Sequence, residues 1–148
     1  MASWQQWLAK GDVKTHQTSK QEIDNLRALI VRDLADAAVT GLSADRRFAT
    51  AYNAALQAAT IAIACSGYRV SARSGHHKVT FEAAALAVGA SAIALSDYFD
   101  ACRRKRNVID YMTSSVATDT ESDEIVQKAN EFRTLVEKWL RAKHPAVA

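Results

Sequence analysis

Alanine is the feature that most restricts how this chain can fold. It occupies 29 of the 148 positions, whereas glycine occurs five times and proline once, at Pro145. Alanine is the best helix former, and folds rich in strands need many turn residues. The composition therefore predicts an all-α protein. It excludes collagen-like, proline-rich and turn-dense all-β folds.

Apolar residues recur at three- and four-residue spacing, which is the period of an amphipathic helix. This pattern predicts an up-down bundle of four to five long helices, preceded by a short N-terminal helix between Ser3 and Gly11. We expect the long helices at about residues 19–41, 43–66, 80–88, 91–112 and 120–144. Capping boxes are expected at Ser3 with Gln6, Ser19 with Glu22 and Thr120 with Asp123.

The segments between the predicted helices are short and polar. We expect loops at 12–18, 68–77 and 113–119, and no segment is rich enough in Gly, Ser or Pro to separate two domains. The sequence thus predicts a single domain over residues 1–148, with its core at about 20–142. Trp4 and Trp7 are expected to pack on the bundle, because two exposed tryptophans would form a sticky apolar patch.

Composition and motifs also restrict where in the cell the protein can act and which cofactors it can use. No uninterrupted apolar run of 18 residues and no signal-peptide pattern occurs, so we expect a cytoplasmic protein that does not bind a membrane. Cys65 and Cys102 lack CxxC spacing and are expected to be reduced. Phosphate-loop, dinucleotide and metal-ligand motifs are missing, so we expect no cofactor and no metal. The net charge of +3 is too small to imply a nucleic-acid partner by itself.

The basic run 103–106 is the most informative segment. Helical geometry places Arg106 on the same stripe as Phe99, Cys102 and Ile109. A guanidinium on a buried stripe costs several kcal/mol unless it is paired or opens into a cleft or an interface. One interpretation is a structural ion pair with Asp110, four residues on. The other is an anion site for phosphates, with Arg103 on its flank and Arg104 and Lys105 pointing outward.

Three further residues could contribute to such a site. Tyr111 lies about 140° around the helix from Arg106, so a bent helix or a twofold dimer would be needed to bring the two together. His76 and His77 are adjacent in sequence, so their side chains diverge and are unsuited to holding one metal. Most such pairs are ordinary loop histidines near a helix start.

These segments resemble the HEPN superfamily (higher eukaryotes and prokaryotes nucleotide-binding). The resemblance rests on Arg103-Arg104-Lys105-Arg106-Asn107-Val108-Ile109-Asp110-Tyr111 and on Ser74-Gly75-His76-His77-Lys78-Val79-Thr80-Phe81-Glu82-Ala83, within a likeness over about residues 20–142. It implies an α-helical bundle throughout. The superfamily motif is an arginine, four to six residues and then a histidine, with a polar residue often directly after the arginine. Arg106 and Asn107 match it, but Tyr111 stands five positions after Arg106 and no histidine follows within the spacing of the motif.

The resemblance implies two functions of different classes. Active branches of the superfamily cleave RNA without a metal, with paired motifs at a dimer interface, which would make Arg106 and Tyr111 catalytic. Tyr111 is a poor proton carrier at neutral pH. We therefore rank first a homodimeric module that binds a nucleotide, RNA or a protein partner. Its expected binding residues are Arg103, Arg106, Asn107, Asp110, His76 and His77.

The same resemblance implies a biological setting. Non-catalytic relatives are often paired with a nucleotidyltransferase, and a toxin–antitoxin or defence system would suit either function. The endoribonuclease, acting as a toxin through Arg106 at the dimer cleft, is the alternative. A third interpretation keeps Arg106 and Asp110 as a purely structural pair that fixes the dimer register.

Overall fold

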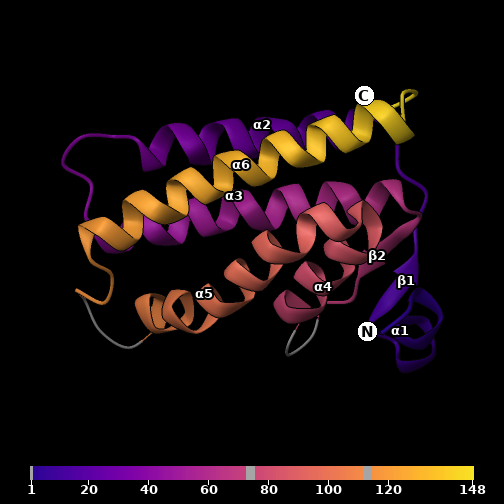
Figure 1. Cartoon of the computed structure of the whole chain (residues 1–148), viewed down its shortest axis with the longest axis horizontal. Coiled ribbons are helices and arrows are strands. Elements are labelled where there is room, and N and C mark those ends of the chain that lie inside the picture. Colours follow the sequence, from indigo (N-terminus) through magenta and orange to yellow (C-terminus); the bar gives the residue numbers. More distant parts are fainter. Residues whose placement is uncertain (1, 73–75, 112–114) are drawn as a thin grey trace.

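The computed structural model describes residues 2–72, 76–111 and 115–148, without the side chains of residues 110 and 111. This part of the chain is almost entirely helical, with one small two-stranded ribbon (Figure 1). The all-α prediction is therefore confirmed. The elements in order are α1 (Trp4–Lys10), β1 (Val13–Thr15), α2 (Lys20–Ala37), α3 (Ala44–Cys65), β2 (Tyr68–Val70), α4 (His76–Val88), a 3-10 turn (Ala90–Ala92), α5 (Ile93–Tyr111) and α6 (Asp119–Lys143).

Helix α3 forms the centre of the bundle. It packs most extensively against α6 and α2, and α4 and α5 lie along its opposite side (Figure 1). Its packing face carries alanines at positions 51, 54, 55, 58, 59 and 62, all buried. Small side chains let neighbouring helices approach closely, so one helix can be surrounded by four others.

The length and apolar character of α3 invite comparison with a membrane span. Within the described residues it is the one helix that satisfies both criteria for a span, but 67% of its most apolar stretch is buried inside the bundle. That burial is typical of the core helix of a soluble protein.

The segments expected to be loops at 12–18 and 68–77 contain the ribbon, so the loop prediction is wrong there. β1 and β2 are antiparallel, with Val13 opposite Val70 and Thr15 opposite Tyr68. Val13 is buried in a small second core with Trp7, and Trp4 stacks on the Tyr68 ring with centroids 4.3 Å apart. The predicted packing of both tryptophans is thus confirmed, and the ribbon is what they pack on.

Two predicted helix starts and one predicted capping box also need correction. Helix α4 is described from His76, so Thr80 lies inside it, and the Thr80 hydroxyl donates to the His76 carbonyl. Helix α6 begins with a capping box of Thr118 and Glu121, two residues before the predicted one. At α2, Ser19 caps the Glu22 amide as expected, but the Glu22 carboxylate turns away to His16 and Thr18.

Candidate functional site

Helix α5 presents the predicted stripe to the core. Phe99 is fully buried, and Cys102 and Ile109 pack against the core from partly buried positions. Arg106 lies on this same side of α5 and is itself partly buried. The helical arithmetic that placed a guanidinium on the inner face of α5 is therefore confirmed.

Two residues of α3 hold the Arg106 guanidinium. Its Nη2 donates a hydrogen bond to Oδ1 of Asn53 at 3.2 Å, and its Cζ lies 5.7 Å from the centroid of the Tyr52 ring. Contact of a guanidinium with an aromatic face is favourable at this distance. Arg103 lies one turn earlier on α5, and its Nε donates to Oδ1 of Asp100 at 3.3 Å.

Tyr52 connects this arginine to the first turn of α4. Its ring is fully buried, and its hydroxyl lies 3.2 Å from Nδ1 of His77. Burial raises the pKa of the Tyr52 hydroxyl well above its usual value of 10, although the positive charges of Arg106 and Arg103 act to lower it. The hydroxyl therefore stays protonated at neutral pH, and it can donate to or accept from His77.

We call these five residues the Arg106 cluster: Tyr52, Asn53, His77, Arg103 and Arg106. The cluster joins the basic run on α5 to the histidine segment on α4, two stretches that the sequence singled out separately. Two guanidinium groups one helical turn apart are a chemistry that can bind an anion, and here Asp100 already pairs with the one on Arg103.

The structure places the other predicted site residues differently. Asn107 is exposed, as is His76, whose ring lies 4.2 Å from that of His77 between centroids. Asp110 and Tyr111 complete α5, but their side chains lie outside the described residues, so the predicted pairing of Asp110 with Arg106 stays a prediction. Of the two side chains expected to point outward, Arg104 is exposed, but Lys105 reaches α6 and forms an ion pair with Glu121.

Sequence reasoning missed Tyr52 and Asn53. A signal was present, because they are a phenol and an amide inside the most alanine-rich helix of the chain. Polar side chains on an otherwise small and apolar face need partners, and here those partners are Arg106 and His77.

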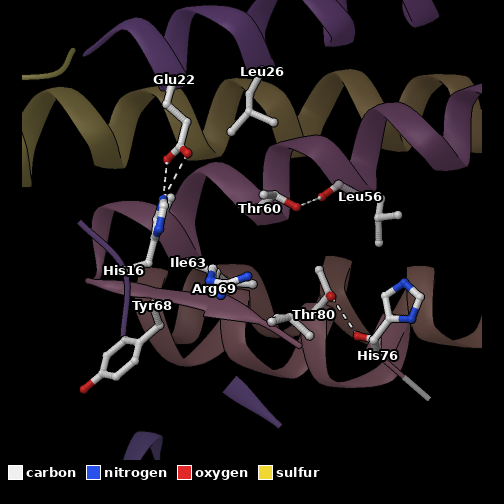
Figure 2. A pocket seen from close by; sticks show the side chains of 12 residues that line it. His16, Glu22, Leu26, Leu56, Thr60, Ile63, Tyr68, Arg69, His76 and Thr80 are labelled. Atoms are coloured by element: carbon white, nitrogen blue, oxygen red, sulfur yellow. Dashed lines mark hydrogen bonds and ion pairs between the residues drawn. The ribbon is translucent and has the colours of Figure 1, made fainter. Parts of the chain in front are cut away.

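A separate pocket of about 340 Å³ opens between α2, α3, α4 and the ribbon (Figure 2). Its apolar lining includes Leu26, Leu56 and Ile63, and Arg69 of β2 and His76 of α4 contribute polar groups. At one end, Nε2 of His16 lies 2.8 Å and 3.0 Å from the two carboxylate oxygens of Glu22. His76 lines this pocket and His77 contacts Tyr52 of the Arg106 cluster. The two rings nevertheless touch edge to face, so the expectation that their side chains diverge is wrong.

Within the described residues, no three His, Cys, Asp or Glu side chains are grouped so as to hold a metal ion.

Comparison with known proteins agrees with this helical arrangement. No curated protein and no solved structure matches the chain. The family model for SAV_6107-like HEPN domains matches residues 38–137, from the end of α2 through most of α6, and so includes every member of the Arg106 cluster. Since the match covers more than half of the sequence, the chain belongs to the SAV_6107-like HEPN family.

Proposed function

We propose that the protein is a non-catalytic module that binds the phosphates of a nucleotide or of RNA at the Arg106 cluster. Membership of a HEPN family supports a nucleotide- or RNA-related role. The observation that carries the proposal is the position of Arg106, which is partly buried yet held between the Asn53 amide and the Tyr52 ring.

The two contacts of Arg106 suit it to phosphate. A guanidinium presents its N–H donors in one plane and can bind two phosphate oxygens at once. The Asn53 side-chain oxygen accepts a hydrogen bond from one of those donors, and the Tyr52 ring packs against the guanidinium. The plane of the guanidinium is therefore fixed before a ligand binds. Preorganisation of this kind lowers the entropy cost of binding. Arg103 adds a second positive charge one turn away.

The proposal includes a homodimer in the cytoplasm. A twofold axis near the end of α5 would bring two copies of Arg106, Asn107 and Tyr111 to one cleft, and Asp110 would lie at its edge. The family likeness also supports a toxin–antitoxin or defence setting with a nucleotidyltransferase as partner. Light scattering at micromolar concentration tests the dimer, and a monomeric mass would remove the shared cleft from the proposal.

Binding is tested with a fluorescently labelled single-stranded RNA and with ATP, by fluorescence anisotropy and by calorimetry. We expect Arg106→Ala to weaken RNA binding about tenfold or more, since hydrogen bonds to charged groups are strong. Arg104→Ala, which removes an exposed charge from the same run, is the matched control. Loss of one phosphate contact should also reduce the log–log salt slope by about 0.7. Equal losses for the two variants would show a diffuse surface effect and contradict the proposal.

A second candidate function is a metal-independent endoribonuclease, and His77 is the observation that favours it. The expected motif histidine is missing after Arg106, but the Tyr52 hydroxyl links the Arg106 side of the bundle to the imidazole of His77. In such a reaction the ribose 2′-oxygen attacks phosphorus and the bond to the 5′-oxygen breaks. His77 would accept the 2′-hydroxyl proton and then give it to the leaving 5′-oxygen, which leaves a 2′,3′-cyclic phosphate and a 5′-hydroxyl.

Cleavage distinguishes the two candidates. Several end-labelled RNAs, with structured and single-stranded regions, are incubated with the protein in EDTA. Cutting by the wild type that is lost in both Arg106→Ala and His77→Ala would establish the enzyme. Binding without cutting would establish the module. If cleavage is lost in Arg106→Ala but kept in His77→Ala, Tyr111 becomes the candidate for proton transfer in place of His77.

A further inference from the structure

The pocket of Figure 2 differs from the Arg106 cluster in shape and in chemistry. Its volume of about 340 Å³ is within the range of small-molecule sites. Leu26 of α2 and Leu56 and Ile63 of α3 supply much of its wall, whereas the Tyr68 ring points to the other face of β2, where it stacks on Trp4. Such a wall suits an apolar body of about the size of one aromatic ring.

The polar groups of the pocket are mostly engaged with each other. Both oxygens of the Glu22 carboxylate contact His16, and the Thr18 hydroxyl donates to one of them. The hydroxyls of Thr60 and Thr80 donate to carbonyls one turn earlier in their own helices, at 2.9 Å and 2.7 Å. These hydroxyls therefore present only oxygen lone pairs to the pocket.

Arg69 is the exception. Figure 2 shows its side chain above β2, between His16 and Thr80, and within the described residues its guanidinium makes neither an ion pair nor a hydrogen bond. The acidic group nearest in the pocket, Glu22, is already matched by His16 and Thr18. Arg69 thus lies at the exposed edge of the pocket, and no carboxylate of the described residues pairs with it.

The strand register gives a second, independent sign of an anion. Arg69 lies directly opposite Lys14 on β1, so the two side chains share one face of the ribbon. Like charges directly opposite on paired strands are destabilising. An anion bound between them would remove that repulsion, whereas a neutral ligand would leave it in place.

We infer that this pocket binds a small organic carboxylate with an apolar body. The carboxylate lies at Arg69, with Lys14 adding to the local positive charge, and the body packs over Leu56 and Ile63. The inference does not rest on the proposed function, because no member of the Arg106 cluster lines the pocket.

The probes are para-fluorobenzoate and the uncharged para-fluorobenzyl alcohol, which have similar size and a similar ring. Fluorine NMR titration of the full chain measures both affinities at fixed ionic strength. We expect the wild type to bind the benzoate about tenfold more tightly than the alcohol, because only the carboxylate can pair with Arg69. Arg69→Gln should abolish that preference, and Lys14→Gln should reduce it two- to threefold.

Matched variants make the result specific to the pocket. Arg141→Gln removes an exposed arginine of α6 and should leave both affinities unchanged. Thr60→Phe adds volume at an exposed position of the lining and should weaken both probes. The inference is overturned if the wild type binds neither probe, if it binds both equally, or if Arg69→Gln keeps the preference. Displacement of the benzoate by inorganic phosphate at equal concentration, or by RNA, would also overturn it.

Discussion

The hydroxyl of Tyr52 lies 3.2 Å from Nδ1 of His77, which ties the middle of α3 to the first turn of α4. The same ring also contacts the guanidinium of Arg106 on α5. One buried phenol therefore connects the two stretches of sequence that resemble the HEPN superfamily. A ligand that changes the position of Arg106 would act on His77 through this ring.

Tyr52→Phe measures what the Tyr52 hydroxyl contributes to stability, apart from the contribution of the ring. The variant keeps the packing and the contact with Arg106 but loses the hydrogen bond to His77, so the free energy of unfolding should fall by about 1 kcal/mol. Urea denaturation at neutral pH measures it. Tyr68→Phe is the control, because within the described residues the Tyr68 hydroxyl makes no hydrogen bond, and it should change stability by less than about 0.5 kcal/mol. An equal effect of the two changes would contradict a role for the Tyr52 hydroxyl.

Thr118→Ala should destabilise the start of α6. The Thr118 hydroxyl accepts from the Glu121 amide, and this half of the capping box is lost. The other half remains, because alanine keeps the backbone amide that donates to the Glu121 carboxylate. We expect a loss of about 1 kcal/mol in thermal or urea unfolding. Thr120→Ala, inside the first turn, is the matched control and should cost less than about 0.5 kcal/mol. If Thr120→Ala lowers the free energy of unfolding more than Thr118→Ala does, Thr120 is the N-cap of α6, as the sequence predicted.

These two threonines show where local sequence rules fail. Thr118 with Glu121 and Thr120 with Asp123 both fit the pattern of a capping box, and only the structure distinguishes them. The apolar stripe of α6, by contrast, was predictable. Ile125, Phe132 and Leu140 recur with the period of a helix, and all three are fully buried.

The ribbon and the Arg106 cluster were harder to predict because they depend on residues far apart in sequence. β1 and β2 have three residues each and pair across more than fifty positions, so neither shows a period of its own. The inward position of Arg106 followed from its own helix. Its partners Tyr52 and Asn53 did not, because their contacts exist only once α3, α4 and α5 have packed together.

Both cysteine thiols should react slowly with alkylating reagents in the native protein. Burial raises the pKa of Cys65 and of Cys102 to about 11, so few thiolates are present at neutral pH. We expect the rate of iodoacetamide labelling, followed by mass spectrometry, to increase steadily from pH 7 to pH 9 without a plateau. The urea-unfolded chain is the control and should react much faster at pH 8. A plateau below pH 8 in the native protein would show a thiol activated by its surroundings.

Glu22 should contribute stability that depends on pH. The Thr18 hydroxyl, together with His16, holds the pKa of the Glu22 carboxyl below its usual value of 4.5, although burial acts in the opposite direction. A lowered pKa in the folded state means that the contribution is present above pH 4.5 and is lost as the pH falls through the lower value. Since the side chain is 39% exposed, the contribution should be less than about 1 kcal/mol.

The difference in unfolding free energy between wild type and Glu22→Gln measures this contribution. It should be largest above pH 4.5 and should shrink towards zero as the folded-state carboxyl becomes protonated. Glu131→Gln on the exposed face of α6 is the control and should show a smaller difference over the same range, because its contact with Lys128 is 3.9 Å long. Thr18→Val should reduce the Glu22 effect, since it removes the largest cause of the lowered pKa. A difference between wild type and Glu22→Gln that does not change with pH would show that Glu22 contributes through packing and not through its charge.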